Sequence, residues 1–309
     1  MPTYNLTDNL TVYRTILDRR ESLAQRIVDR HYLHRPELQQ RYGSEGRKHC
    51  LTDARRHLDA LSQAIVVSRT ALFVDYVAWA KIVLASRGIS SDDLADNLES
   101  CLQTLRDELP PDQAAIAARY ILDSLSCLPV LPTTLPSFLS TDRPLADLAR
   151  NYLEALLKGD RRTASHLIQE AVQNGTSIRD IYLHVFQRSQ YEIGRLWQTN
   201  EISVGQEHLC TAAIQLIMSQ LYPAIFGTER KDRRMVATCV GGDLHEIGIR
   251  MVADFFEMDG WDTIYLGADV PADSIIQAVS IQRAHVLAIS TTLVTHVSAV
   301  ASLIGLVRA

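Results

Sequence analysis

A change of hydrophobic period at Met235 constrains the fold more than any other feature of this sequence. The run MVATCV (235–240) is short and apolar, which is typical of a buried strand, and it ends at two glycines. The pattern after it predicts a helix at 247–258, a strand at 262–266, a helix at 271–281 and a strand at 285–290. Strands that alternate with helices predict a Rossmann-like parallel sheet with helices on both faces.

The sequence before Met235 is helical in pattern, so the predicted fold class is α + α/β. Apolar residues recur at helical spacing through 1–128, and four of the ten prolines fall in 129–144. The predicted parts are an all-helical, sensor-like domain (1–128), a linker (129–143), a four-helix bundle (144–228) and a Rossmann-like domain (234–309). Three strands are few for such a domain, so we expect it to continue beyond residue 309.

Composition excludes several classes of protein. No apolar run is long enough to cross a membrane, and the first ten residues lack a secretory pattern. The five cysteines have no CxxC spacing, which favours reduced thiols in a cytoplasmic protein over a disulfide framework or a zinc site. A net charge of −5 argues against a dedicated nucleic-acid binder.

The loop after the first predicted strand carries the chemistry. It reads Gly-Gly-Asp-Leu-His-Glu-Ile-Gly from Gly241 to Gly248, without the GxGxxG spacing of dinucleotide sites. Asp243 can accept a hydrogen bond from one imidazole nitrogen of His245, which makes the other nitrogen a better metal ligand. A single histidine suits a metal whose other positions are filled by a macrocycle. The alternative is an ordinary nucleotide-binding loop with a chance histidine.

The pattern Asp-x-His-x-x-Gly, followed after 41 residues by Ser-Thr-Thr, resembles the cobalamin-binding motif of methionine synthase, corrinoid proteins and cobalamin photoreceptors. The resemblance implies that His245 is the lower axial ligand of cobalt, with Asp243 and Ser290 as its hydrogen-bonded relay. It also implies that Gly248 leaves room for the nucleotide tail of the cofactor. The other residues predicted to bind the cofactor are Gly242, Gly267 and Thr292. The family's later Gly-Gly pair is missing, because only 19 residues follow Ser290.

A second signature lies in the predicted bundle, where Trp197 is followed after nine residues by Glu207-His208. This arrangement resembles the cap of CarH-type light-sensing regulators, which covers the adenosyl group of adenosylcobalamin. An aromatic face suits adenine, and Glu207 and His208 suit ribose hydroxyls. The family has a histidine directly after the tryptophan, whereas Gln198 stands here, so a bis-histidine product through this position is not expected. The alternative is that Trp197 is an ordinary core residue and that Glu207 and His208 are a pair of surface residues.

The N-terminal helices carry a weaker pattern. They are similar to the helical sensor region of photocobilins, photoreceptors that pair cobalamin with biliverdin. That resemblance implies a bilin site at His57, Tyr76, Trp79 and Arg56. The alternative is a helical core with these aromatic rings inside it, or a dimer contact.

Together these patterns predict a cobalamin-binding light sensor and not an enzyme. Loss of the adenosyl group would change self-association, an attached output domain or a downstream protein, with no direct nucleic-acid or membrane binding. The alternative is a corrinoid protein that carries methyl groups for a methyltransferase. A mutase subunit fits less well, because mutases lack the helical cap.

Overall fold

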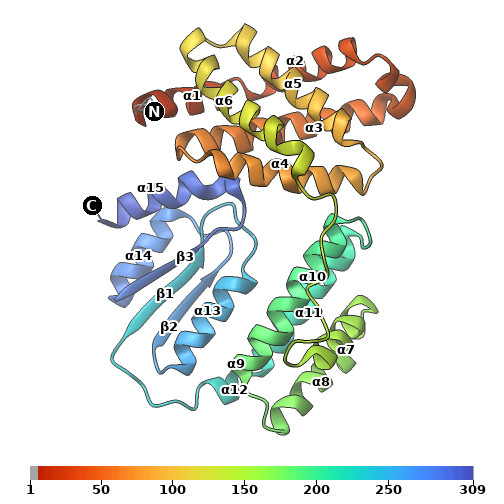
Figure 1. The fold of residues 1–309 in the computed structure, drawn as a ribbon. Coiled ribbons are helices and arrows are strands. Elements are labelled where there is room, and N and C mark those ends of the chain that lie inside the picture. Colours follow the sequence, from red (N-terminus) through yellow and green to blue (C-terminus); the bar gives the residue numbers. More distant parts are fainter. Residues whose placement is uncertain (1–5, 309) are drawn as a thin grey trace. The chain divides into compact units, whose positions relative to one another are not determined.

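The computed structural model describes residues 6–308 (Figure 1). Residues 1–5, where the sequence showed no secretory pattern, lie outside the described residues. Contacts divide the chain into two units, one of 1–134 with 293–298 and one of 135–292 with 299–309. The fold is mostly helical, with one small parallel sheet of three strands.

The first unit is built from amphipathic helices around one apolar core. Its helices are α1 (Leu6–Asp18), α2 (Arg20–His34), α3 (Glu37–Val66), α4 (Thr70–Ala85), α5 (Ser91–Glu108) and α6 (Pro111–Cys127), followed by the short η1 (Leu128–Val130). Ser90 begins α5 with a capping box in which its side chain accepts from the Asp93 backbone N–H. Prolines 110 and 111 open α6, where a missing N–H costs nothing.

Helix α3 contains a kink that the sequence pattern did not reveal. Gly43 has a positive φ of 64° inside the helix, a conformation that L side chains rarely adopt. The helix therefore consists of a short part from Glu37 to the kink and a long part that ends at Val66.

The second unit begins with an irregular segment, because 135–145 contain no helix or strand. The helices that follow are α7 (Ala146–Leu157), α8 (Arg161–Gln173), α9 (Ile178–Ile181), the π-helical turn η2 (Tyr182–Phe186), α10 (Gln187–Gln198), α11 (Val204–Gln220) and α12 (Tyr222–Ile225). Gly159 and Gly175 have positive φ and follow the ends of α7 and α8. Helix α11 ends at Gln220, and α12 is a separate short helix.

The sheet contains β1 (Arg234–Cys239), β2 (Asp262–Gly267) and β3 (Val286–Ser290), all parallel, in the order β2-β1-β3. Its helices are α13 (Ile247–Met258), α14 (Ala272–Gln282) and α15 (Val297–Arg308), which is preceded by the short η3 (Val294–His296). The chain moves one way from β1 to β2 and the opposite way from β2 to β3. Right-handed crossovers therefore put α13 and α14 on opposite faces of the sheet.

The bundle and α13 share one apolar core. Ile247 and Met251 of α13 belong to the same buried cluster as Tyr182, Phe186 and the inner residues of α7 and α11. The two parts predicted as separate domains thus pack together within the second unit. Nowhere in 6–308 does a helix combine the length and apolar character that crossing a bilayer requires.

Candidate functional site

The candidate site lies at the carboxyl ends of β1 and β3. Cys239 and Ser290 are partners in the register of these strands, and the Val240 N–H donates to the Ser290 carbonyl over 3.0 Å. The strand order reverses at β1, since β2 lies on one side of it and β3 on the other. In open parallel sheets, ligands bind in the crevice at such a reversal.

Asp243 and His245 form a fixed pair in the loop after β1. One carboxylate oxygen, Oδ1, accepts from the His245 backbone N–H (3.0 Å) and lies 2.8 Å from His245 Nδ1. The other, Oδ2, accepts from the Thr292 backbone N–H over 2.6 Å. Because an ionised carboxylate only accepts, Nδ1 carries the proton. His245 Nε2 has no hydrogen-bond partner within 6–308, and the side chain is 54% exposed.

The Asp243 carboxylate is charged although it is buried. Burial raises its pKa, but hydrogen bonds from the Thr292 and His245 backbone N–H groups and from the imidazole outweigh burial, and the pKa is about 2. A permanent anion behind Nδ1 holds the histidine ring in one tautomer and leaves Nε2 as the available donor atom.

Two glycines shape this loop. Gly242 has a φ of 86°, and its N–H donates to Asp269 Oδ1 over 2.7 Å, while the Asp269 N–H donates to the Asp243 carbonyl. Gly267, at the end of β2, has a φ of 87°. Both predicted glycines therefore have a backbone reason to be glycine. Asp269, which the sequence reasoning missed, holds the loop from the neighbouring strand end.

The residues around His245 fit a bulky macrocyclic cofactor. A Cβ atom added at Gly248 would meet nothing within 4 Å, so the packing of the protein itself does not require glycine there. Leu244, also missed from the sequence, is 71% exposed beside the histidine and offers an apolar contact. Within 6–308 no three His, Cys, Asp or Glu residues gather into a metal site. The donor set is thus a single imidazole with open space beside it.

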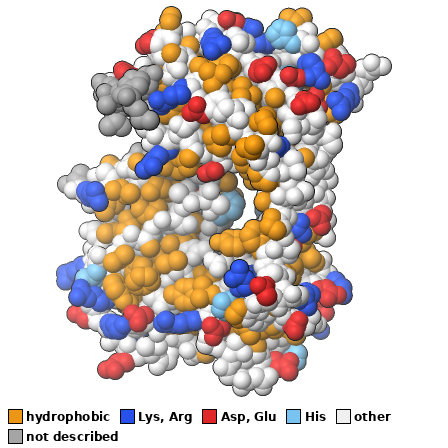
Figure 2. All heavy atoms as spheres, viewed as in Figure 1, with side chains coloured by type: hydrophobic (Ala, Val, Ile, Leu, Met, Phe, Trp, Pro, Cys, Tyr) orange, Lys and Arg blue, Asp and Glu red, His pale blue; other side chains and the backbone are white. Residues whose placement is uncertain are grey.

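The predicted cap residues flank the connection between α10 and α11. Trp197 is half-buried in the last turn of α10, and Glu207 and His208 lie in the first turn of α11. Glu207 Oε2 lies 3.2 Å from His208 Nδ1, and Thr211 Oγ1 donates to Glu207 Oε1 over 3.0 Å. Ser203 begins α11 with a capping box, which fixes where these side chains emerge. Figure 2 shows hydrophobic side chains gathered on the visible face of the α/β part.

Three of the four residues predicted to bind a bilin come together in the core of the first unit. His57 Nδ1 lies 2.7 Å from the Tyr76 hydroxyl, and the Tyr76 and Trp79 ring centroids are 6.1 Å apart. Burial, with a smaller effect of the Arg56 charge, lowers the pKa of His57 to about 4, so the ring is neutral. Arg56 is exposed and paired with Asp53. These contacts are those of a hydrogen-bonded core histidine.

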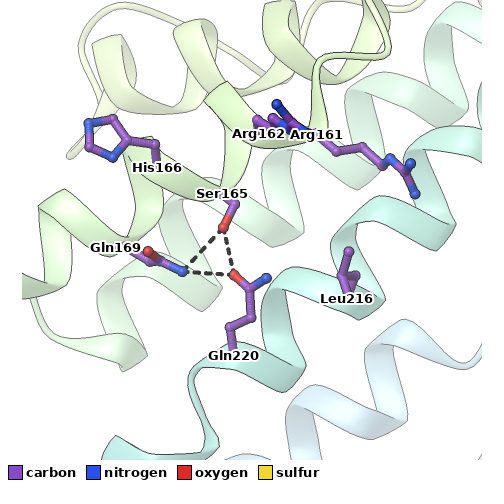
Figure 3. A pocket seen from close by; sticks show the side chains of 7 residues that line it. All are labelled: Arg161, Arg162, Ser165, His166, Gln169, Leu216 and Gln220. Atoms are coloured by element: carbon purple, nitrogen blue, oxygen red, sulfur yellow. Dashed lines mark hydrogen bonds between the residues drawn. The ribbon is translucent and has the colours of Figure 1, made fainter.

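Two pockets lie elsewhere in the second unit. One of about 390 Å³ lies between α8 and α11, where Ser165, Gln169 and Gln220 form a hydrogen-bonded triangle below two arginines (Figure 3). The other, of about 120 Å³, is apolar and adjoins Gly241, between residues of α14 and α15. None of the side chains that line either pocket belongs to the predicted cofactor set.

Two family models match this chain, and both are described as a B12 binding domain. One covers residues 148–222, the bundle, and the other covers 233–309, the sheet and its helices. The second match includes the Asp243–His245 loop. These matches support a cobalamin-binding module in the second unit.

Related proteins belong to two kinds. The chain is 34% identical over 89 residues to the HTH-type transcriptional repressor CarA of Myxococcus xanthus, which is 29% of this chain and 31% of the repressor. It is 23% identical over 146 residues to a corrinoid protein of Desulfitobacterium hafniense, 46% of this chain and 68% of that protein. The chain thus matches less than a third of the repressor's length.

Among solved structures, the monomethylamine corrinoid protein of Methanosarcina barkeri is similar, with 19% identity. The match covers 53% of this chain and 79% of that chain, and the TM-score is 0.48.

Proposed function

We propose that this chain is a cobalamin-binding light sensor, with the cofactor held between the bundle and the α/β part. The observation that carries the cofactor is the His245 ring, fixed at Nδ1 by a buried charged Asp243 and exposed at Nε2. Ser290 and Thr292 complete the proposed lower side, with Gly248 beside the space for the nucleotide tail.

The proposed upper group is adenosyl, because the cap has the chemistry of a nucleoside site. Trp197 offers an aromatic face at the end of α10, and Glu207 and His208 offer hydrogen-bonding groups at the start of α11. When bound, adenosylcobalamin supplies a cobalt–carbon bond that visible light breaks. Loss of the adenosyl group would empty the space against Trp197 and free the helices to change position, which is a two-state element under ligand control. The proposed output is a change of self-association or of an attached or downstream protein.

The alternative function is a corrinoid protein that carries methyl groups for a methyltransferase. It is favoured by the longer match to a corrinoid protein, 46% of this chain against 29% for the repressor. The two functions differ in what the cap must do, because a carrier has to expose the cobalt to its partners.

Spectra of the purified full chain with adenosylcobalamin, in the dark and under green light, separate the two functions. For a sensor we expect a bound adenosylcobalamin spectrum that converts on illumination, together with a shift in size-exclusion elution. Preference for methylcobalamin and an unchanged elution would support the carrier. His245→Ala should abolish the difference between the absorption spectra of the bound and the free cofactor. His166→Ala, which changes an exposed histidine on α8, is the control and should bind as wild type does.

A bilin in the first unit stays a prediction with weaker support. The His57–Tyr76 hydrogen bond already pairs both polar groups inside the core, so a bilin would have to replace this contact. A red-absorbing band after biliverdin is added to the protein would establish this second chromophore, and its loss in Tyr76→Phe would locate it.

A further inference from the structure

One face of α11 carries a row of polar residues. Glu207, Thr211, Gln215 and Ser219 are spaced four apart, which places them above one another on the same side of the helix. Thr211 Oγ1 donates to Glu207 Oε1 (3.0 Å), and Ser219 Oγ donates to the Gln215 carbonyl (2.9 Å). We call these four residues the polar stripe. It begins at a proposed contact of the upper group and continues for three further turns.

The stripe meets the residue directly after His245. The Glu246 carboxylate uses its two oxygens in different directions: Oε1 accepts from Gln215 Nε2 of the stripe, and Oε2 accepts from the Tyr265 hydroxyl of β2 over 2.6 Å. Charge-assisted hydrogen bonds of this kind are among the strongest in proteins. One side chain therefore connects α11, the cobalt-ligand loop and the sheet.

A second side chain holds the same turn of α11. Arg250, one helical turn beyond Glu246, donates from Nη1 to the Gln215 carbonyl (3.2 Å) and from Nη2 to Ser219 Oγ (2.7 Å). Glu246 and Arg250, which lie one helical turn apart, therefore both bond to the same turn of α11. A rotation or slide of α11 has to break these bonds or move the loop that carries His245.

We propose that Glu246 is a positioning residue that couples α11 to the His245 loop. In the proposed function, on which this inference rests, the group beside Glu207 then changes the strength of the His245–cobalt bond through the stripe. Coupling of two sites is reciprocal, so a firm lower ligand also favours the arrangement of α11 that accepts the larger upper group. This link could not be predicted from the sequence, because Gln215 and Glu246 are brought together only by tertiary packing.

The competing explanation is that Glu246 only stabilises the loop. Loss of a purely stabilising contact would weaken all cobalamins by the same factor. Coupling instead predicts a change in the ratio between two cobalamins that differ only in the upper group. Two variants separate the two hydrogen bonds of the Glu246 carboxylate. Gln215→Leu removes the bond to α11, and Tyr265→Phe removes the bond to β2.

The first experiment measures dissociation constants for adenosylcobalamin and hydroxocobalamin in the dark. We expect Gln215→Leu to reduce the preference for adenosylcobalamin by about tenfold, within the range of typical coupling energies. Tyr265→Phe should weaken both cofactors while their ratio stays within about twofold of wild type. An unchanged ratio in Gln215→Leu would overturn the coupling.

The second experiment needs no cofactor. Amide hydrogen exchange of the cofactor-free chain should be faster at 243–248 in Gln215→Leu than in wild type, because Glu246 has lost its bond to α11. Leu216→Ala changes the neighbouring exposed residue of the same helix and is the control. If the wild-type chain bound no cobalamin, the proposed function would be wrong. The exchange rates of Gln215→Leu and wild type would still test the coupling between α11 and the His245 loop. Equal exchange in the variant and in wild type would refute the link itself.

Discussion

His245 Nδ1 lies 2.8 Å from Oδ1 of Asp243, and the same oxygen accepts the His245 backbone N–H. Asp243 thus fixes both the ring and the backbone of the residue that we propose binds cobalt. Its second oxygen is held by the Thr292 N–H, in the loop after β3. Asp243 and His245, which follow β1, are therefore also held by the loop after β3.

Asp243→Asn should weaken cobalamin binding by about 10- to 100-fold, the usual effect of removing the group that orients a ligand histidine. An amide has no charge to hold Nδ1–H, and it can present its NH₂ group to the ring instead. Titration followed by absorption measures the change. Asp273→Asn, an exposed acid in the first turn of α14, should bind as wild type does. Equal affinities in the two variants would contradict the role of Asp243.

Trp197→Ala should weaken adenosylcobalamin more than hydroxocobalamin, because only the first presents an adenine to the indole face. Stacking of a base on an aromatic side chain contributes about 1–3 kcal/mol, so we expect a loss of roughly 5- to 150-fold for adenosylcobalamin. Competition binding in the dark gives the ratio. Tyr191→Ala alters an exposed aromatic residue of the same helix and should leave the ratio unchanged. Equal losses of affinity for both cofactors would contradict the assignment of Trp197 to the cap.

The sequence predicted the secondary structure of the second unit from local signals. The three strands begin and end within a residue or so of the predicted positions, because each is a short apolar run bounded by glycine or polar residues. The breaks after α7 and α8 coincide with Gly159 and Gly175 for the same reason. The π-helical turn at Tyr182–Phe186 was not predicted, since it interrupts a helix without changing its apolar spacing.

The candidate site was only partly accessible from sequence. Asp243 and His245 were found because two residues of separation suffice for their contact. The Thr292 N–H as a partner of Asp243, and Asp269 as the support of Gly242, depend on the order of the strands, which the period of a sequence does not determine. Leu244 did leave a signal, an apolar residue between two polar ones in a glycine-rich loop, and it could have been noted.

The first unit should lose stability as the pH falls from 8 to 5, through two buried histidines, His57 and His31. Burial holds the folded-state pKa of each at about 4, below the unfolded value near 6.5, so the unfolded chain takes up the protons first. The contribution of His57 is fully present above pH 6.5, and about 2 kcal/mol of it is lost by pH 5. Thermal unfolding at both pH values should show a smaller difference for His57→Gln than for wild type. His34→Gln, an exposed histidine of α2, should behave as wild type.

Two buried tyrosines of the second unit offer a test of the contact between the bundle and α13. The Tyr182 hydroxyl donates to Asp254 Oδ2 of α13 over 2.7 Å, and both residues are buried. The Tyr152 hydroxyl is also buried, but it has no hydrogen-bond partner within 6–308. Burial raises the pKa of Asp254, while the bond from Tyr182, the charge of Arg250 and a hydrogen bond from Tyr222 oppose that rise.

Tyr182→Phe should lower the free energy of unfolding by about 1–3 kcal/mol, because it removes a hydrogen bond from a buried carboxyl group. Tyr152→Phe removes the same atom from the same apolar cluster, yet breaks no bond, and should be neutral or slightly stabilising. Urea unfolding of both variants measures the difference. If the two substitutions had equal effects, the Tyr182–Asp254 bond would contribute nothing to stability. The packing of Ile247 and Met251 and the bonds from Arg250 to α11 would then hold α13 on the bundle.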